Sequence, residues 1–325
     1  MKDTDFLFLT SMLRSREAVM LTDERIERML DAPEFDDAAK ILVDCGYPDM
    51  SGMNANQLEG VLQEHRSDVF FELGQHAQAK VLIDLFRLKY DYHNVKVLVK
   101  AQGAVADHLL SASGRVGVKE ISEAYVTGER SDIPPMVAEA MSAASGVLSR
   151  TGNPQAMDIE VDKIYYSELL TIALKTKEKF VVGYVRLLID SANLRIAVRS
   201  ARTGRDTDFL RVALIPGGIV KNYETVAAFG DKSLAPFSGN KLESAVRLGQ
   251  DAMKSGSQTM FELACDNAAL QYISGTAYIS FGPGPVIAYL AKLEWEVTTV
   301  RMILTGKLTG ISPEIIRERL RECHV

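Results

Sequence analysis

Apolar residues between positions 81 and 99 recur at alternating steps of four and three, the spacing of an amphipathic helix that packs lengthwise on other helices. Two later segments repeat this spacing, with Ser191 as the one polar exception. The three apolar stripes are Val81, Leu85, Leu88, Tyr92, Val95 and Val99; then Phe180, Tyr184, Leu187, Ser191, Leu194 and Val198; and then Val286, Leu290, Leu293, Val297, Val300 and Leu304. The pattern predicts three long helices of one design.

Polar residues beside each stripe repeat as well. The three sets are Arg87, Asp91, Asn94 and Lys96; Arg186, Asp190, Asn193 and Arg195; and Lys292, Glu296, Thr299 and Arg301. Their carboxylates are separated by 190 − 91 = 99 and 296 − 190 = 106 residues, so the repeating unit has the size of a domain and not of a solenoid turn. We predict an all-α protein of three similar helical units, residues 1–112, 113–202 and 203–325.

Local signals agree with long helices. Apolar pairs such as Phe70-Phe71 and Tyr165-Tyr166 precede further periodic segments, so each unit is expected to hold at least two helices. Gly114 and Gly204 are predicted to follow helix ends, and Thr22 and Ser312 to cap helix starts. The segment Phe281–Pro285 is predicted to be a turn that places Pro285 at a helix start, and residues 211–215 are ambiguous with a strand.

The polar set of the first copy has two interpretations. Asp91, His93 and Asn94 resemble the acid, base and amide of a catalytic cleft. However, Ala192 and Thr298 occupy the positions that correspond to His93, whereas the Asp/Glu and Asn/Thr positions recur. Because a catalytic centre is rarely needed three times in one chain, we interpret these residues as structural groups that hold each helix to neighbouring segments.

Composition and the remaining motifs give little support to an enzyme. The net charge is −6, with 37 basic among 43 acidic residues, which argues against a nucleic-acid partner. Glu72 with His76, and Cys323 with His324, lack the third ligand of a zinc site. The three cysteines form no CxxC pair, which indicates a reducing compartment, and no apolar run reaches the length of a membrane span. We expect no catalytic residues, cofactor or metal.

The repeated stretches YDYHNVKVLVKA and IDSANLRIAVRSARTGRD, with PVIAYLAKLEWEVTTVRMILTGK near the C-terminus, resemble the C subunit of bacterial and archaeal V/A-type rotary ATPases, a relative of the d subunit of the eukaryotic vacuolar ATPase. The resemblance covers nearly the whole chain. It implies a cup of three similar helical units around a pseudo-threefold axis. It also implies a cytoplasmic, membrane-peripheral protein without catalytic residues.

The implied role is mechanical. The resemblance places such a protein between the central stalk and the membrane proteolipid ring, where it links ATP turnover to proton or sodium transport. Stiff helix packing is compatible with that role, because it can transmit torque with little internal deformation. Two alternatives remain open at this point. One is a helical-repeat adaptor of another complex, and the other is an all-α enzyme with a catalytic set outside the repeat register.

Overall fold

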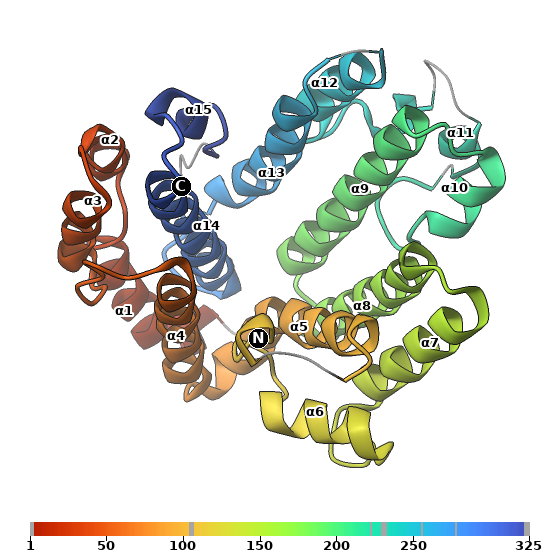
Figure 1. The fold of residues 1–325 in the computed structure, drawn as a ribbon, viewed down its shortest axis with the longest axis horizontal. Coiled ribbons are helices and arrows are strands. Elements are labelled where there is room, and N and C mark those ends of the chain that lie inside the picture. The colour runs from red at the N-terminus through yellow and green to blue at the C-terminus, as the bar shows by residue number, and fades with distance from the viewer. Residues whose placement is uncertain are drawn as a thin grey trace. The chain divides into compact units, whose positions relative to one another are not determined.

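The computed structural model describes residues 3–103, 107–221, 223–228, 233–254, 256–276 and 278–321. Every secondary-structure element in these residues is a helix, so the prediction of an all-α protein is confirmed (Figure 1). The chain divides into two compact units. Unit 1 consists of residues 1–87 and 274–325, and unit 2 of residues 88–273.

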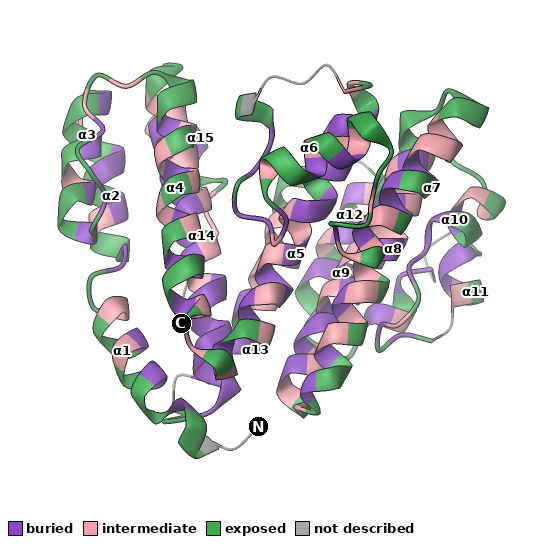
Figure 2. Cartoon of the chain, turned by 90° about the horizontal axis from the view of Figure 1, so that it is seen from below, coloured by how far each residue is buried: buried purple, intermediate pink, exposed green. Residues whose placement is uncertain are grey.

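Unit 1 combines both ends of the sequence. Its helices are α1 (Leu7–Glu17), α2 (Asp23–Asp31), α3 (Phe35–Ile41), α4 (Ala55–Gly74), the first part of α5 (Ala77–Lys100), α14 (Pro283–Leu308) and α15 (Pro313–Arg317), with 3-10 turns at Asp3–Phe6 and Leu42–Cys45. Helix α14 contacts α1, α3 and α4, and most of its residues are buried (Figure 2). It is therefore the central helix of this unit.

Unit 2 is continuous in sequence. It contains the rest of α5, then α6 (Val118–Thr127), α7 (Pro135–Thr151), α8 (Pro154–Thr176), α9 (Lys179–Arg202), α10 (Thr207–Ala213), α11 (Tyr223–Ala227), α12 (Glu243–Lys254) and α13 (Gln258–Ser274), with 3-10 turns at Asp107–Leu109 and Ala235–Phe237. Helix α8 packs on α7 and α9, and α9 also contacts α12. None of the described helices combines the length and apolar composition needed to cross a bilayer.

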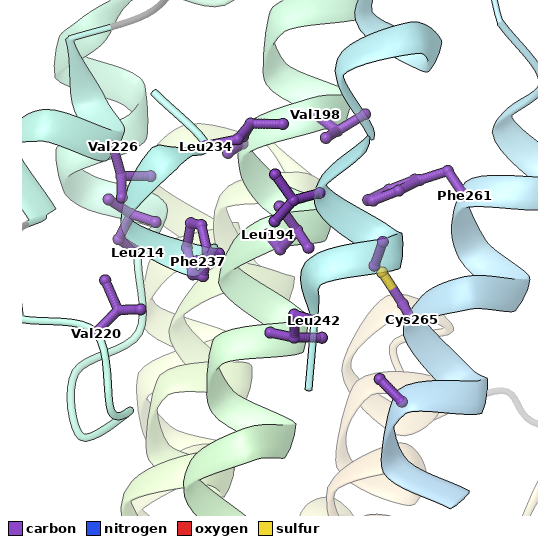
Figure 3. Close-up of a cluster of buried hydrophobic side chains, with 14 of the residues drawn as sticks. Leu194, Val198, Leu214, Val220, Val226, Leu234, Phe237, Leu242, Phe261 and Cys265 are labelled. Carbon is purple, nitrogen blue, oxygen red and sulfur yellow. The ribbon is translucent and has the colours of Figure 1, made fainter. Parts of the chain in front are cut away.

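The three predicted long helices are α5, α9 and α14, and their apolar stripes face the interior. All residues of the third stripe are buried, and only Val81 and Phe180 in the other two are partly exposed. In unit 2, Leu194 and Val198 of the second stripe lie in a cluster with Phe237, Phe261 and Cys265 (Figure 3). Burial of this apolar surface is the main stabilising contribution to the unit.

Helix starts follow their capping residues. Thr22 accepts a hydrogen bond from the Arg25 N–H at the start of α2, as predicted. Ser312 lies at the predicted N-cap position of α15, before Pro313, but its side chain forms no capping hydrogen bond there. Asn54 caps α4 with a complete capping box, which the sequence patterns considered above did not indicate.

Two local predictions needed correction. Helix α5 ends at Lys100, and the glycine with positive φ after it is Gly103, so Gly114 does not follow a helix end. Gly204, with a φ of 64°, does follow the end of α9. Helix α14 begins at Pro283 and not at Pro285, and residues 211–213 belong to α10, which removes the ambiguity with a strand.

Candidate functional site

The Asp91 carboxylate holds a loop that follows α5. Its Oδ1 accepts the backbone N–H of Val116 at 3.1 Å, and its Oδ2 accepts Arg115 Nε at 2.7 Å. The Asp91 side chain is completely buried, and Arg115 also donates to Glu168 of α8 at 3.0 Å. A Cβ atom at Gly114 would lie 2.4 Å from Asp91 Oδ1, so only glycine permits this approach. We call residues 111–116 the first loop.

Asn94 holds the other end of the first loop. Its side-chain Nδ2 donates to the Ser111 carbonyl at 2.9 Å, and its Oδ1 accepts the Ser111 N–H at 2.8 Å. An asparagine amide has one donor group and one acceptor, which match the two backbone groups of a single residue. The loop is thus attached to α5 at two points, three residues apart on the helix.

The second repeated helix holds a loop in the same way. Asn193 bonds both backbone groups of Ile215, at 2.8 and 2.7 Å. Asp190 accepts the N–H groups of Ile219 at 3.0 Å and Val220 at 3.3 Å. A Cβ atom at Gly218 would lie 1.9 Å from Asp190 Oδ1. We call residues 215–220 the second loop.

The two loops correspond position by position. Gly218 follows Gly114 by 218 − 114 = 104 residues, and the same offset relates Ile215 to Ser111 and Val220 to Val116. One difference stands out, because Ile219 occupies the position of Arg115. The second loop therefore supplies the same backbone donors but no cation.

The third repeated helix uses its carboxylate on the N-terminal part of the chain. Glu296 accepts the Leu21 N–H at 2.6 Å and the Tyr47 hydroxyl at 3.1 Å, and its side chain is buried. Glu296 of α14 thus binds the segment before α2, just as Asp91 of α5 and Asp190 of α9 bind the first and second loops. Thr299, which replaces Asn at this helix, is buried.

The last basic residue of each polar set forms an ion pair with another helix. Lys96 of α5 pairs with Asp162 of α8 at 2.5 Å, Arg195 of α9 with Glu262 of α13 at 2.6 Å, and Arg301 of α14 with Glu59 of α4 at 2.6 Å. Arg195 also pairs with Asp266 at 2.6 Å. In all three cases the partner belongs to the first helix of a sequence-adjacent helix pair, α4–α5, α8–α9 or α13–α14.

The first basic residue of each polar set lies nearer the surface. Arg87, Arg186 and Lys292 are partly exposed, and the Arg186 Nε is buried without a hydrogen-bond partner. His93 is exposed, and its Nε2 lies 3.1 Å from the Leu109 carbonyl. The structure thus places His93 on the surface, away from the buried faces of Asp91 and Asn94.

Burial dominates the electrostatics of these carboxyl groups. It raises the pKa of Asp91, and the neighbouring Arg115 guanidinium opposes this change. Burial raises the pKa of Asp190 to about 6, since only backbone N–H groups and more distant cations compensate. Burial likewise raises the pKa of Glu296, against the Leu21 N–H and the Tyr47 hydroxyl.

The repeated pattern indicated the helix positions but not most of their partners. Arg115, Glu59 and Tyr47 lie outside the repeated stretches, so periodicity gave no signal for them. Gly114 and Gly218 could have indicated the loops, because each follows an aspartate of the motif at a similar interval. A glycine permits the backbone to approach a buried side chain closely, and that is the property that would have indicated the loops.

Several candidate metal ligands have other partners. Glu72 accepts a hydrogen bond from Arg16, and the His76 ring lies 5.7 Å from that of Phe8. Cys323 and His324 lie outside the described residues. In the part of the chain that the structure describes, no three His, Cys, Asp or Glu side chains converge as a metal site would require. The polar groups described above instead attach segments and helices to one another.

These contacts and the helical elements of the described residues define the class of protein by fold, an all-α protein whose buried polar groups hold its helices and loops together. The family model described as ATP synthase (C/AC39) subunit matches residues 9–319, so the chain belongs to this family. The C subunit of the V-type sodium ATPase of Enterococcus hirae is 22% identical, over 97% of this chain and 98% of its own length. The C subunits of the A-type ATP synthases of Pyrococcus abyssi and Haloferax volcanii are 24% and 22% identical, over 99% and 96% of this chain and 91% and 96% of their own lengths. The chain is accordingly a structural subunit of a rotary ATPase, and the predicted class is confirmed.

Proposed function

We propose that this chain joins the central stalk of a V/A-type ATPase to the membrane proteolipid ring and transmits torque between them. In this role it keeps ATP turnover in the head linked to proton or sodium transport in the membrane. It would act on the cytoplasmic face, held to the membrane by protein contacts. The full-length match to the C subunits of rotary ATPases is the observation that carries the proposal.

We further propose that the chain is a triplication of one helical unit around a pseudo-threefold axis, with the shape of a cup or funnel and unit boundaries near residues 112 and 202. The twelve polar motif residues belong to the repeated helix of each unit. Support comes from the two matching loop contacts of Asp91 and Asp190 and from the three corresponding ion pairs. The pairs join α5 to α8, α9 to α13 and α14 to α4.

This arrangement suits a mechanical subunit. Each repeated helix is fixed to a loop through buried hydrogen bonds and to a second helix through an ion pair, so relative sliding of these elements would leave buried polar groups without partners. Resistance to such sliding is what transmission of torque requires. The contacts need no chemical step of their own.

The proposal predicts that membranes without this chain hydrolyse ATP without driving ion transport. The measurement compares ATP hydrolysis with ATP-driven proton or sodium uptake in vesicles from cells that lack the chain. Restoration of uptake by the wild-type chain is the control. Normal ATP-driven transport in its absence would refute the coupling role.

Recovery of partners separates this role from that of an adaptor in another complex. A tagged chain purified from native membranes in mild detergent is expected to bring down the head subunits, the central stalk and the proteolipid ring. Recovery of unrelated proteins alone, from membranes with an intact ATPase, would favour the adaptor.

A further inference from the structure

The first and second loops are held by carboxylates in different electrostatic settings. Asp91 and Asp190 both have completely buried side chains and both accept backbone N–H groups from their loops. Arg115 compensates Asp91 with a direct ion pair at 2.7 Å. Among the described residues, no lysine or arginine forms an ion pair with Asp190.

The difference follows from a single position. The cation of the first loop is Arg115, and the corresponding residue of the second loop is Ile219, whose apolar side chain is 50% exposed. Ile219 still donates its backbone N–H to Asp190 but brings no charge. A buried carboxylate without a cation is costly to keep ionised.

Other charged groups near Asp190 do not replace the missing cation. Arg186, one turn earlier on α9, and Lys221 after the loop act on it at longer range, and Lys221 Nζ donates to the Gly218 carbonyl at 2.7 Å. Tyr223 of α11 is a further titratable group near it. On the α7 and α8 side, Glu139 and Lys163 line an adjacent pocket together with Arg211 and Glu224.

We propose that the attachment of the second loop to α9 is proton-linked: the loop opens more readily at neutral pH than in mildly acidic solution, and it does so because Asp190 lacks the cation that Arg115 gives to Asp91. In the closed loop the buried carboxyl group favours its neutral form. Opening exposes it to water, where the ionised form is stable. A rise in pH therefore favours the open loop.

The sign and size follow from linkage. The pKa of Asp190 is about 6 in the closed structure, and 3.8 is the ordinary value for an exposed aspartate. The contribution of Asp190 to the stability of the closed loop is fully present below pH 3.8 and is lost as the pH rises through about 6. Between about pH 5 and pH 7.5 the opening equilibrium of the loop is expected to shift by about tenfold.

The opening has a structural consequence. Leu214, directly before the second loop, and Pro216 within it line a pocket of about 570 Å³ between the loop region and helices α7 and α8. Release of Ile219 and Val220 from Asp190 would loosen the C-terminal half of the second loop, while Asn193 still holds Ile215 beside this pocket. The proton-linked opening thus concerns the C-terminal half of the second loop, and it does not depend on the proposed coupling role.

Amide hydrogen exchange of the full-length chain tests the inference. Exchange is followed by mass spectrometry in peptides that cover the second and first loops, at about pH 5 and pH 7.5, with correction for intrinsic exchange rates. Protection of the second loop is expected to fall about tenfold at the higher pH, and that of the first loop to fall less. Equal protection of the second loop at both pH values would overturn the proposal.

Two variants identify the responsible group. Ile219→Arg gives the second loop the cation of the first and is expected to reduce its pH dependence to that of the first loop. Asp190→Asn removes the titrating group and is expected to abolish the pH dependence, so it decides the question if the first variant does not fold. A wild-type pH dependence in Asp190→Asn would show that Asp190 is not the responsible group, and one in folded Ile219→Arg would show that the missing cation is not the cause.

Discussion

Replacing Asp91 with Ala is expected to lower the free energy of unfolding by about 1 to 3 kcal/mol. The substitution leaves the buried Val116 N–H without its acceptor and removes one of the two carboxylates that compensate Arg115. Desolvated groups that lose a partner cost more than the hydrogen bond itself contributed. Urea unfolding of the full-length chain, followed by circular dichroism, measures the change.

An exposed carboxylate provides the control for this prediction. The Glu123 side chain is 62% exposed and lies 3.8 Å from Lys119, a surface pair on α6. Glu123→Ala is expected to change the free energy of unfolding by no more than about 0.5 kcal/mol. If Asp91→Ala unfolded at the same urea concentration as the wild type, the contacts of Asp91 with the first loop would contribute nothing to stability.

The helices could be predicted from the sequence because their signal is local and periodic. An apolar residue every three or four positions sets the buried face of α5, α9 and α14, whatever their neighbours are. Helix starts at Thr22 and Ser312 were equally legible, because a cap acts within one turn. Helix ends were harder to place, as the end of α5 at Lys100 shows.

The partners of the motif residues could not be predicted in this way. Asp91 meets Arg115, and Glu296 meets Leu21, over separations in which no repeated pattern connects them. In addition, every residue except proline has a backbone N–H, so residue type does not show which N–H a carboxylate binds. Three matching carboxylate positions predict that three contacts exist, whereas the tertiary fold decides what each one binds.

The compact units show a further limit. Contacts divide the chain after residue 87, within α5. A helix that continues through a boundary leaves no break in periodicity, so a pattern along the chain cannot show where the contacts change. The same holds for the joining of both chain ends in unit 1, because sequence distance does not report spatial distance.

Gly218→Ala is expected to destabilise the second loop strongly. The added Cβ atom would lie 1.9 Å from Asp190 Oδ1 and 2.9 Å from its Cγ, well inside van der Waals contact. Asp190 cannot move away without releasing Ile219 and Val220, so either the loop or its hydrogen bonds must give way. Overpacking of this kind costs about 1 to 3 kcal/mol, which thermal or urea unfolding would detect.

At another glycine of the chain, substitution by alanine is expected to raise the stability of the protein. Gly146 lies within α7, and a Cβ atom there would meet nothing within 4 Å. Gly146→Ala is expected to stabilise the protein by about 0.4 to 1 kcal/mol, because alanine restricts the unfolded chain and fits the helix without strain. Opposite shifts for the two variants would tie the cost of Gly218→Ala to the close approach of the loop to Asp190. Stabilisation by both would mean that the second loop can recede from the carboxylate without loss, and the buried contact would then not fix its position.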